Sequence, residues 1–186
     1  MKRTIYLLAG VLLLVGLLTG CKTNPAEQTA EPTAEQMVGE TTQAGYDGIT
    51  FSLTGLMGET VDDSIIRGNK LTMVNFWATW CGPCVNEIPD LSKLNDDYAD
   101  KGFGVIGVLF ADTDTDGTKT FLEEKGVSYP VVSVAGVFSD LSANFSAIPT
   151  TMFFDVNGEQ VGETEVGAKE YDEWAALIDS LLEQAS

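Results

Sequence analysis

Histidine is absent from this chain of 186 residues. Without an imidazole, the chain cannot hold a Ser–His or Cys–His nucleophile pair, a histidine-ligated zinc ion or a histidine acid–base catalyst. Basic residues are also scarce, with 10 Lys and Arg against 28 Asp and Glu, and the formal net charge is −18. Such a charge repels nucleic-acid phosphates and anionic lipid headgroups, so we expect no nucleic-acid partner.

Cysteine is the third scarce residue, and its three copies fall into two settings. Cys21 follows a hydrophobic leader, whereas Cys81 and Cys84 form a Cys-x-x-Cys pair. No cysteine remains for another disulfide, so the pair is catalytic, structural by itself or half of a metal site. A zinc site would need a second pair of ligands, which the chain lacks. A disulfide that closes so short a loop stabilises little by chain entropy.

Residues 1–20 have the pattern of a signal peptide, with a short positive segment and then an apolar run too short for a membrane-spanning helix. Residues 18–21, Leu-Thr-Gly-Cys, resemble a bacterial lipobox. The resemblance implies cleavage before Cys21 and attachment of diacylglycerol to its sulfur, which would anchor the chain to a membrane. The alternative is an ordinary signal peptide with a chance cysteine.

Residues 21–45 are rich in Thr, Ala, Glu, Gln and Pro and hold almost no large apolar side chains. Such a segment cannot form a core, so we predict a disordered tether that follows the lipid anchor. Residues 46–186 have the length of a single domain.

Within residues 46–186, short apolar runs alternate with amphipathic segments, which predicts an α/β fold with a mixed sheet. The predicted strands cover residues 49–53, 71–77, 103–110, 129–134, 150–156 and 160–166. The predicted helices cover residues 81–99 (interrupted by Pro89), 118–125, 138–145 and 170–182. Asn157-Gly158 predicts a tight hairpin turn between the last two strands.

The Cys-x-x-Cys pair follows a predicted strand and opens a predicted helix. Unpaired N–H groups and the helix dipole at this end favour a thiolate on Cys81. Cys84 falls one turn further on, in a more buried position, and Pro83 suits the first helical turn because its missing N–H has no partner there. The placement predicts that Cys81 attacks a disulfide and that Cys84 resolves the resulting mixed disulfide.

The sequence Trp-Ala-Thr-Trp-Cys-Gly-Pro-Cys at residues 77–84, with Pro89 and the downstream Ile-Pro-Thr at residues 148–150, resembles thioredoxin. Asn75, Glu87 and the lipoprotein leader narrow the resemblance to the TlpA/ResA-like branch of extracytoplasmic thioredoxins. It covers the chain from about residue 48. The resemblance implies a thioredoxin-like fold with a central mixed sheet flanked by helices, an N-terminal edge strand or hairpin and a βα insertion. It also implies a redox-active Cys81–Cys84 disulfide that needs no cofactor or metal.

The resemblance assigns further site residues. Pro149 would be a cis-proline beside the cysteines, although a trans-proline that opens a strand is the alternative. The implied client-binding residues are Trp80, Gly82, Pro83, Ile148 and Thr150. Trp77 either belongs to the site or simply fills the core.

Proton transfer is expected to depend on Asn75 and Glu87. The buried aspartate of thioredoxin corresponds to Asn75, whose amide cannot take up a proton. Cys84 must still lose its proton before it can resolve the mixed disulfide. Glu87, one helical turn after Cys84, is the nearest candidate acceptor; the alternative is a solvated surface glutamate.

A second motif, in residues 112–123, matches a calcium-binding pattern. Residues 112–117, Asp-Thr-Asp-Thr-Asp-Gly, together with Glu123 fit the EF-hand calcium pattern. A predicted strand precedes them where the pattern requires a helix, and Lys119 follows where it requires an apolar residue. We therefore expect an acidic loop that caps the next helix, with a weak calcium site as the alternative.

Together these features predict an extracytoplasmic, monomeric thiol–disulfide oxidoreductase. The Gly-Pro dipeptide between the cysteines is typical of reducing thioredoxins, so we expect a reductant of client disulfides. The resemblance implies a CcdA-type membrane thiol transporter as electron donor, and apocytochrome c or oxidised methionine sulfoxide reductase as clients.

Two alternatives remain for the function. A peroxiredoxin-type thiol peroxidase would need a Pro-x-x-x-Thr/Ser-x-x-Cys frame, which Trp77 and Ala78 do not supply. A non-enzymatic lipoprotein binding module could keep the fold as a scaffold, although the intact cysteine pair and its proline argue against it.

Overall fold

The computed structural model describes residues 48–110 and 115–185. The predicted signal peptide, Cys21 and the tether lie outside these ranges, as do Asp112 and Asp114 of the acidic loop. Within the described ranges, no helix has the length and apolar character needed to cross a membrane.

The described residues form a central five-stranded mixed sheet with the strand order β5-β4-β3-β6-β7. Strands β3 (Leu71–Trp77), β4 (Phe103–Leu109) and β5 (Val131–Ser133) are parallel. Strands β6 (Thr150–Asp155) and β7 (Glu165–Val166) complete the other side and run antiparallel to their neighbours. The sheet therefore has the mixed arrangement that the sequence predicts.

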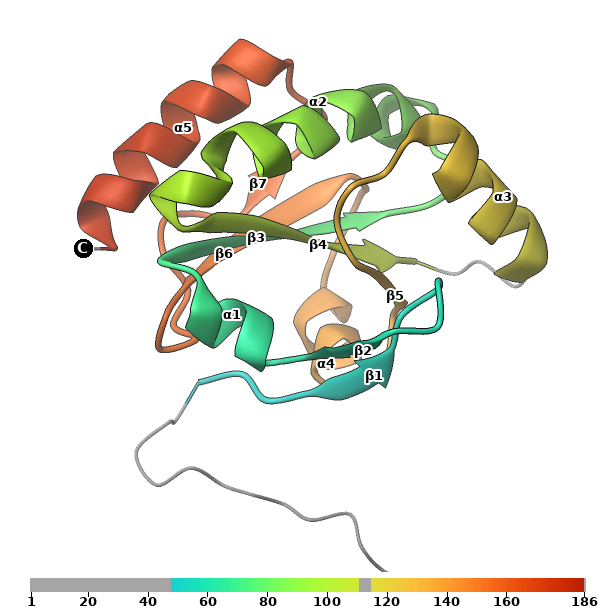
Figure 1. Cartoon of the computed structure of the whole chain (residues 1–186), viewed down its shortest axis with the longest axis horizontal. Coiled ribbons are helices and arrows are strands. Elements are labelled where there is room, and N and C mark those ends of the chain that lie inside the picture. Colours follow the sequence, from blue (N-terminus) through green and yellow to red (C-terminus); the bar gives the residue numbers. More distant parts are fainter. Residues whose placement is uncertain (1–47, 111–114, 186) are drawn as a thin grey trace, which may run out of the picture. The chain divides into compact units, whose positions relative to one another are not determined.

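Helices cover both faces of this sheet (Figure 1). One face carries α2 (Gly82–Tyr98), which ends in a 3-10 turn (Ala99–Lys101), together with α3 (Thr115–Lys125) and α5 (Tyr171–Gln184). The other face carries a hairpin of β1 (Ser52–Thr54) and β2 (Thr60–Asp62), and the short helices α1 (Ser64–Gly68) and α4 (Val137–Ser142). The β5–α4 unit lies in sequence between α3 and β6, which fits the implied βα insertion.

Strand β3 divides the core because its side chains alternate between the two faces. Met73 and Trp77 belong to the apolar cluster under α2 and α5, whereas Val74 and Phe76 belong to the cluster on the hairpin side. Asn75 is buried and points to the α2 side. The alternation thus sets one polar side chain directly beneath the helix that carries the cysteines.

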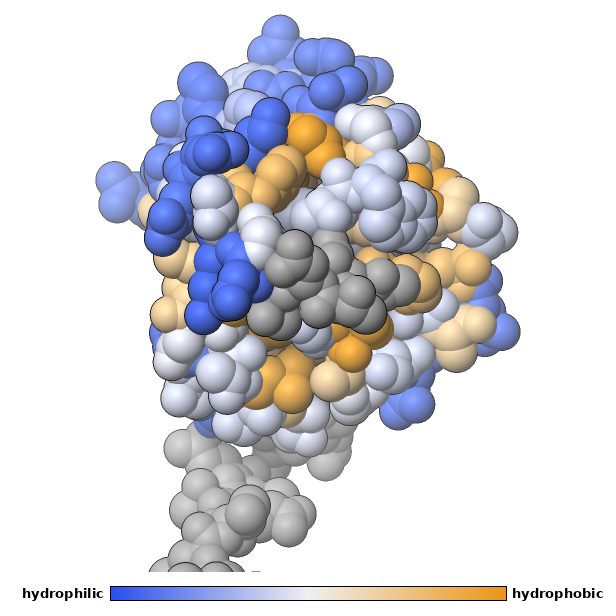
Figure 2. Space-filling view, turned by 90° about the vertical axis from the view of Figure 1, so that its right-hand side faces the viewer, coloured by the Kyte–Doolittle hydropathy of each residue, from blue (hydrophilic) through white to orange (hydrophobic). Residues whose placement is uncertain are grey.

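The surface is mostly polar on the side where α3 lies (Figure 2). Apolar areas there are split into separate patches by polar side chains. A pocket of about 140 Å³ between the β1–β2 turn and α3 is lined mainly by apolar groups, among them Met57, Leu122 and Val131. Small divided patches of this kind are normal on a solvated surface.

Two sequence predictions about strands were wrong in extent. The predicted returning strand at residues 160–166 pairs regularly only at Glu165–Val166, while Gln160 makes an isolated bridge to Phe154. Gly162 has a positive φ of 72°, which turns the chain away between these points. The predicted strand at residues 49–53 begins later, at Ser52, and pairs with β2 in the N-terminal hairpin that the resemblance implies.

The predicted interruption at Pro89 was also wrong, because α2 runs through this residue without a break. A proline inside a helix removes one hydrogen bond, to the carbonyl four residues earlier, here that of Val85. Pro89 is exposed, so water can hydrate this carbonyl, and the helix continues.

Candidate active site

The two cysteines bracket the first turn of α2, immediately after the loop that leaves β3. Cys81 is the N-cap residue, and Cys84 lies in the first turn. The sulfurs are joined in a disulfide of 2.09 Å. The Cys84 N–H donates to Cys81 Sγ over 3.3 Å. After reduction, this donor and the helix dipole would stabilise a thiolate on Cys81, as the sequence predicts.

The pair is asymmetric toward solvent and toward its neighbouring loop. Cys81 is 7 % exposed and Cys84 only 1 %. Cys81 Sγ lies 3.6 Å from the carbonyl oxygen of Ile148. An oxidised sulfur carries no hydrogen, so this is a van der Waals contact that becomes a hydrogen bond only when a Cys81 thiol is present. Cys81 is therefore the sulfur that an incoming partner reaches first.

The loop opposite the cysteines has the geometry that the sequence predicts. The Ile148–Pro149 peptide bond is cis. The Thr150 hydroxyl donates to the carbonyl of Ala147 over 2.7 Å, which closes the turn around the proline. The Gly167 N–H donates to the Pro149 carbonyl over 2.9 Å and ties the loop to the segment after β7.

The two tryptophans beside the motif have different environments. Trp80 is 66 % exposed, and the neighbouring Gly82 and Pro83 are exposed as well. Trp77 is 1 % exposed and stacks on Phe121 with ring centroids 5.9 Å apart. Trp77 is thus a core residue, and Trp80 is the aromatic side chain that a docking partner can contact.

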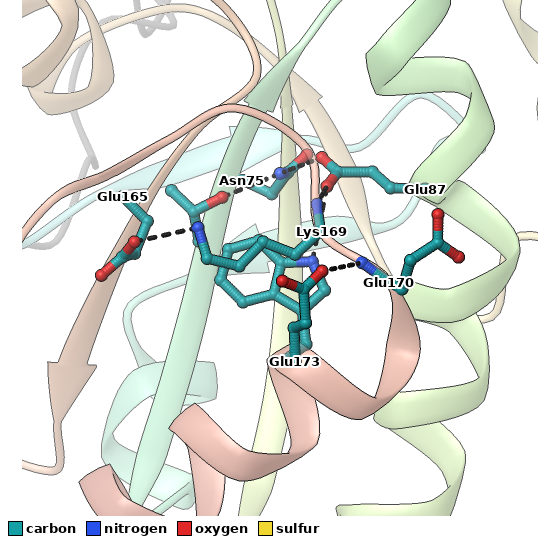
Figure 3. A network of polar contacts seen from close by, with 8 residues as sticks. Asn75, Glu87, Glu165, Lys169, Glu170 and Glu173 are labelled. Carbon is teal, nitrogen blue, oxygen red and sulfur yellow. Dashed lines mark hydrogen bonds and ion pairs between the residues drawn. The ribbon is translucent and has the colours of Figure 1, made fainter.

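Glu87 lies in the interior at the seam between α2 and α5, with only 2 % of its surface exposed. Its Oε1 accepts from Asn75 Nδ2 at 3.0 Å. Its Oε2 accepts from the Lys169 N–H at 3.3 Å and from Trp174 Nε1 at 3.4 Å (Figure 3). The predicted alternative, a solvated surface glutamate, was wrong, because this carboxylate is enclosed by three donors.

Burial raises the pKa of Glu87 from 4.5 to about 6. The hydrogen bonds from Asn75, Lys169 and Trp174 and the charge of Lys169 lower this pKa but do not offset burial. Burial and the charge of Glu87 also raise the pKa of the nearby Tyr129, so this phenol stays neutral. Glu87 is consequently able to exchange protons close to neutrality.

Sequence reasoning missed two parts of this network. It predicted the helix at residues 170–182 but not that the indole N–H of Trp174 on this helix donates to Glu87. It gave no role to Lys169, whose contribution to Glu87 comes from the backbone N–H. A backbone donor has no sequence signature, and the second role of a core tryptophan depends on how α5 packs against α2.

The side chains in the described part of the chain form no metal site. No cluster of three or more His, Cys, Asp or Glu there could hold a metal ion.

The sheet order, the Cys81–Cys84 pair at a helix N-terminus and the facing cis-proline define a thioredoxin-like disulfide oxidoreductase. Residues 37–177 match the Redoxin family, and the chain belongs to this family. It is a thiol–disulfide oxidoreductase whose redox pair is Cys81 and Cys84.

Two named relatives agree with this assignment. The chain is 32 % identical over 140 residues to the thioredoxin-like protein YneN of Bacillus subtilis, covering 74 % of this chain and 79 % of the relative. It is 30 % identical over 136 residues to the thiol-disulfide oxidoreductase ResA of Halalkalibacterium halodurans, covering 70 % and 76 %.

Solved structures show the same fold. A thiol:disulfide interchange protein of the thioredoxin family from Chlorobium tepidum matches with a TM-score of 0.65 and 25 % identity, over 73 % of this chain and 94 % of the other. StoA from Bacillus subtilis matches with a TM-score of 0.59 and 19 % identity, over 72 % and 98 %.

Proposed function

We propose that the chain is a membrane-anchored extracytoplasmic reductant that transfers electrons from a Cys81/Cys84 dithiol to disulfides in client proteins. The observation that carries the proposal is the asymmetry of the pair. Cys81 lies at a helix N-terminus and faces the Ile148–Pro149 loop, while Cys84 is buried in the first turn of the same helix, three residues before the buried Glu87.

The reaction runs in two exchanges. The Cys81 thiolate attacks a sulfur of the client disulfide and forms a mixed disulfide, and the first client sulfur leaves as a thiolate. The Cys84 thiol then gives its proton to the carboxylate of Glu87 and attacks Cys81 Sγ. This step forms the Cys81–Cys84 disulfide and releases the second client thiolate, so that two electrons reach the client.

The client would dock on the surface around the pair. Trp80, Gly82 and Pro83 are exposed at the start of α2. Ile148 and Thr150 flank the cis-proline and would position the client backbone, as the family resemblance implies. An exposed tryptophan offers a large, rigid apolar contact at a low entropic cost, which suits a partner that binds briefly.

The leader sequence supports a reaction outside the cytoplasmic membrane. The apolar run and Leu-Thr-Gly-Cys at residues 18–21 support export and lipidation of Cys21. We propose a CcdA-type membrane thiol transporter as electron donor, and apocytochrome c or oxidised methionine sulfoxide reductase as clients. The relative ResA, which is named a thiol-disulfide oxidoreductase, supports this reaction class.

Equilibration with a glutathione redox buffer tests the direction of electron flow. A reductant has a lower reduction potential than its clients. The Cys81–Cys84 pair should therefore be oxidised in a glutathione buffer whose redox potential is about −200 mV. The wild-type protein should also catalyse reduction of insulin disulfides by dithiothreitol, and Cys81→Ser should not. A potential near that of a strong oxidant, about −120 mV, would contradict the proposed direction. Rapid consumption of hydrogen peroxide would instead indicate a thiol peroxidase.

A further inference from the structure

A small pocket opens between α2 and the start of α5, directly beside Glu87. Its volume is about 110 Å³, which is enough for several water molecules. Its walls are Asn86 and Asp90 from α2 and Ala168, Lys169, Glu170 and Glu173 from the segment that leads into α5. Glu87 itself lines this pocket, although only 2 % of its surface is exposed.

The proposed reaction, on which this inference rests, gives Glu87 one proton per turnover that must afterwards leave. Cys84 cannot take the proton back, because its sulfur is now part of the disulfide. On the side that faces the sheet, Glu87 contacts the Asn75 amide and the Trp174 indole. Both are neutral hydrogen-bond donors, and neither can take up the proton. Tyr129, on the same side of the sheet, has a raised pKa and stays neutral.

The groups at the mouth of the pocket can pass a proton onward. Asp90 accepts from the Tyr171 N–H at 3.2 Å, and Glu173 accepts from the Glu170 N–H at 3.1 Å. These bonds hold the two carboxylates in place, and the bond between Glu170 and Glu173 is drawn in Figure 3. Lys169 adds the one positive charge among the lining residues, and its ammonium group is paired with Glu165 at 3.0 Å. Fixed carboxylates raise the local proton concentration and exchange protons with water rapidly.

We propose that this pocket is the proton port of the active site, through which water carries the proton between Glu87 and solvent past Asp90 and Glu173. During resolution, the Cys84 thiol gives its proton to Glu87, and its sulfur attacks Cys81 while the client leaves as a thiolate. The protonated Glu87 then releases its proton through the pocket, and the client thiolate takes up a proton from solvent. Protons therefore leave at the α2–α5 seam, whereas electrons leave from Cys81 at the loop of Ile148 and Pro149.

The test fills the pocket and times the two exchanges separately. The reduced full-length protein is mixed rapidly with excess Ellman's reagent at pH 6, where the first thiolate release reports attack by Cys81 and the second reports resolution by Cys84. Ala168→Trp should slow the second release about 5- to 10-fold, because at pH 6 much of Glu87 is protonated and must release that proton through the blocked pocket before it can accept the proton of Cys84. The first release should change less than about 2-fold. The matched control is Ala176→Trp, an exposed position on α5 outside the pocket, which should leave both phases unchanged.

A second variant that fills the pocket tests whether misfolding of the first variant explains its slow second phase. Asn86→Trp fills the pocket from α2 and should reproduce the slow second phase, together with a larger solvent deuterium isotope effect on that phase. If both folded variants, verified by thermal melting, resolve at the wild-type rate, the proton reaches solvent by another route and the port is wrong. Glu87→Gln separates this failure from that of the reaction itself. A slow second phase in Glu87→Gln with normal blocked variants would overturn only the port, whereas a normal second phase in Glu87→Gln would overturn the role of Glu87.

Discussion

Asn75 Nδ2 donates a hydrogen bond to Glu87 Oε1 over 3.0 Å, and both side chains are almost completely buried. The contact joins β3 to α2, one helical turn after Cys84. It leaves a neutral amide on the strand and a carboxylate on the helix, and in the proposed reaction this carboxylate accepts the proton of Cys84. Asn75 also donates to Thr151 Oγ1 over 3.0 Å, which fixes the amide in this orientation.

Asn75→Asp should convert this contact into a pair of carboxyl groups that share a proton. Because two carboxylates so close together cannot both ionise, the pKa of the pair rises. The pH midpoint of the resolution step should move upward by at least about one unit. The measurement is the second phase of the reaction with Ellman's reagent between pH 5 and 9. Asn157→Asp, the same change in an exposed turn, should leave the midpoint in place.

Glu87 should also make folding stability depend on pH. Its pKa is raised from 4.5 to about 6, so the folded state binds this proton more tightly than the unfolded state does. The free energy of unfolding should therefore fall as pH rises through this window, by about 2 kcal/mol from Glu87 alone. Guanidinium unfolding of the oxidised protein at pH 4.5 and 7.5 measures the fall, and Glu87→Gln should remove it. Equal pH dependence in the two proteins would show that Glu87 is not desolvated.

Long apolar segments could be predicted well from the sequence, and short elements could not. Strand β3 has the predicted bounds, since its mostly apolar run of seven residues is buried along its whole length. The three-residue strand β2 and the five-residue helix α1 are too short to show a period. The path of α2 through Pro89 depends on exposure of the proline, which local sequence does not reveal.

The cysteine side of the site was predictable because its chemistry depends on local order. A strand, a loop and a helix start place Cys81 and Cys84 without help from distant segments. The environment of Glu87 was only partly predictable, since two of its donors, Lys169 and Trp174, lie more than 80 residues away in sequence. Their positions depend on the packing of α5 against α2, which no local pattern encodes.

Trp80→Ala should weaken client binding without weakening the fold. Because 66 % of this side chain is exposed, its loss removes contact surface and leaves no cavity. The kcat/KM for reduction of a protein disulfide should fall about 5- to 20-fold, chiefly through KM. The first phase with Ellman's reagent and the melting temperature should stay close to wild type. Met57→Ala, which removes another exposed apolar side chain, is the control and should leave client kinetics unchanged.

Cys21→Ser should release the protein from membranes, because the Leu-Thr-Gly-Cys sequence predicts that this sulfur carries the lipid. The measurement is partitioning into detergent after expression of the full-length chain in a lipoprotein-processing bacterium. Cys81→Ser, the same substitution at the redox pair, should partition like wild type. Persistent membrane association of Cys21→Ser would mean that an uncleaved apolar leader is the anchor.

The central claim is that Cys81 attacks the client disulfide and Cys84 resolves the mixed disulfide. Trapping of mixed disulfides tests this claim most directly. Reduced Cys84→Ser and Cys81→Ser are each incubated with insulin, and intact mass spectrometry measures the covalent adduct. Cys84→Ser should accumulate the adduct, because Cys81 attacks and nothing resolves the product. Cys81→Ser should form almost none, because Cys84 is 1 % exposed. Equal adduct in both variants, or more adduct with Cys81→Ser, would contradict the assignment.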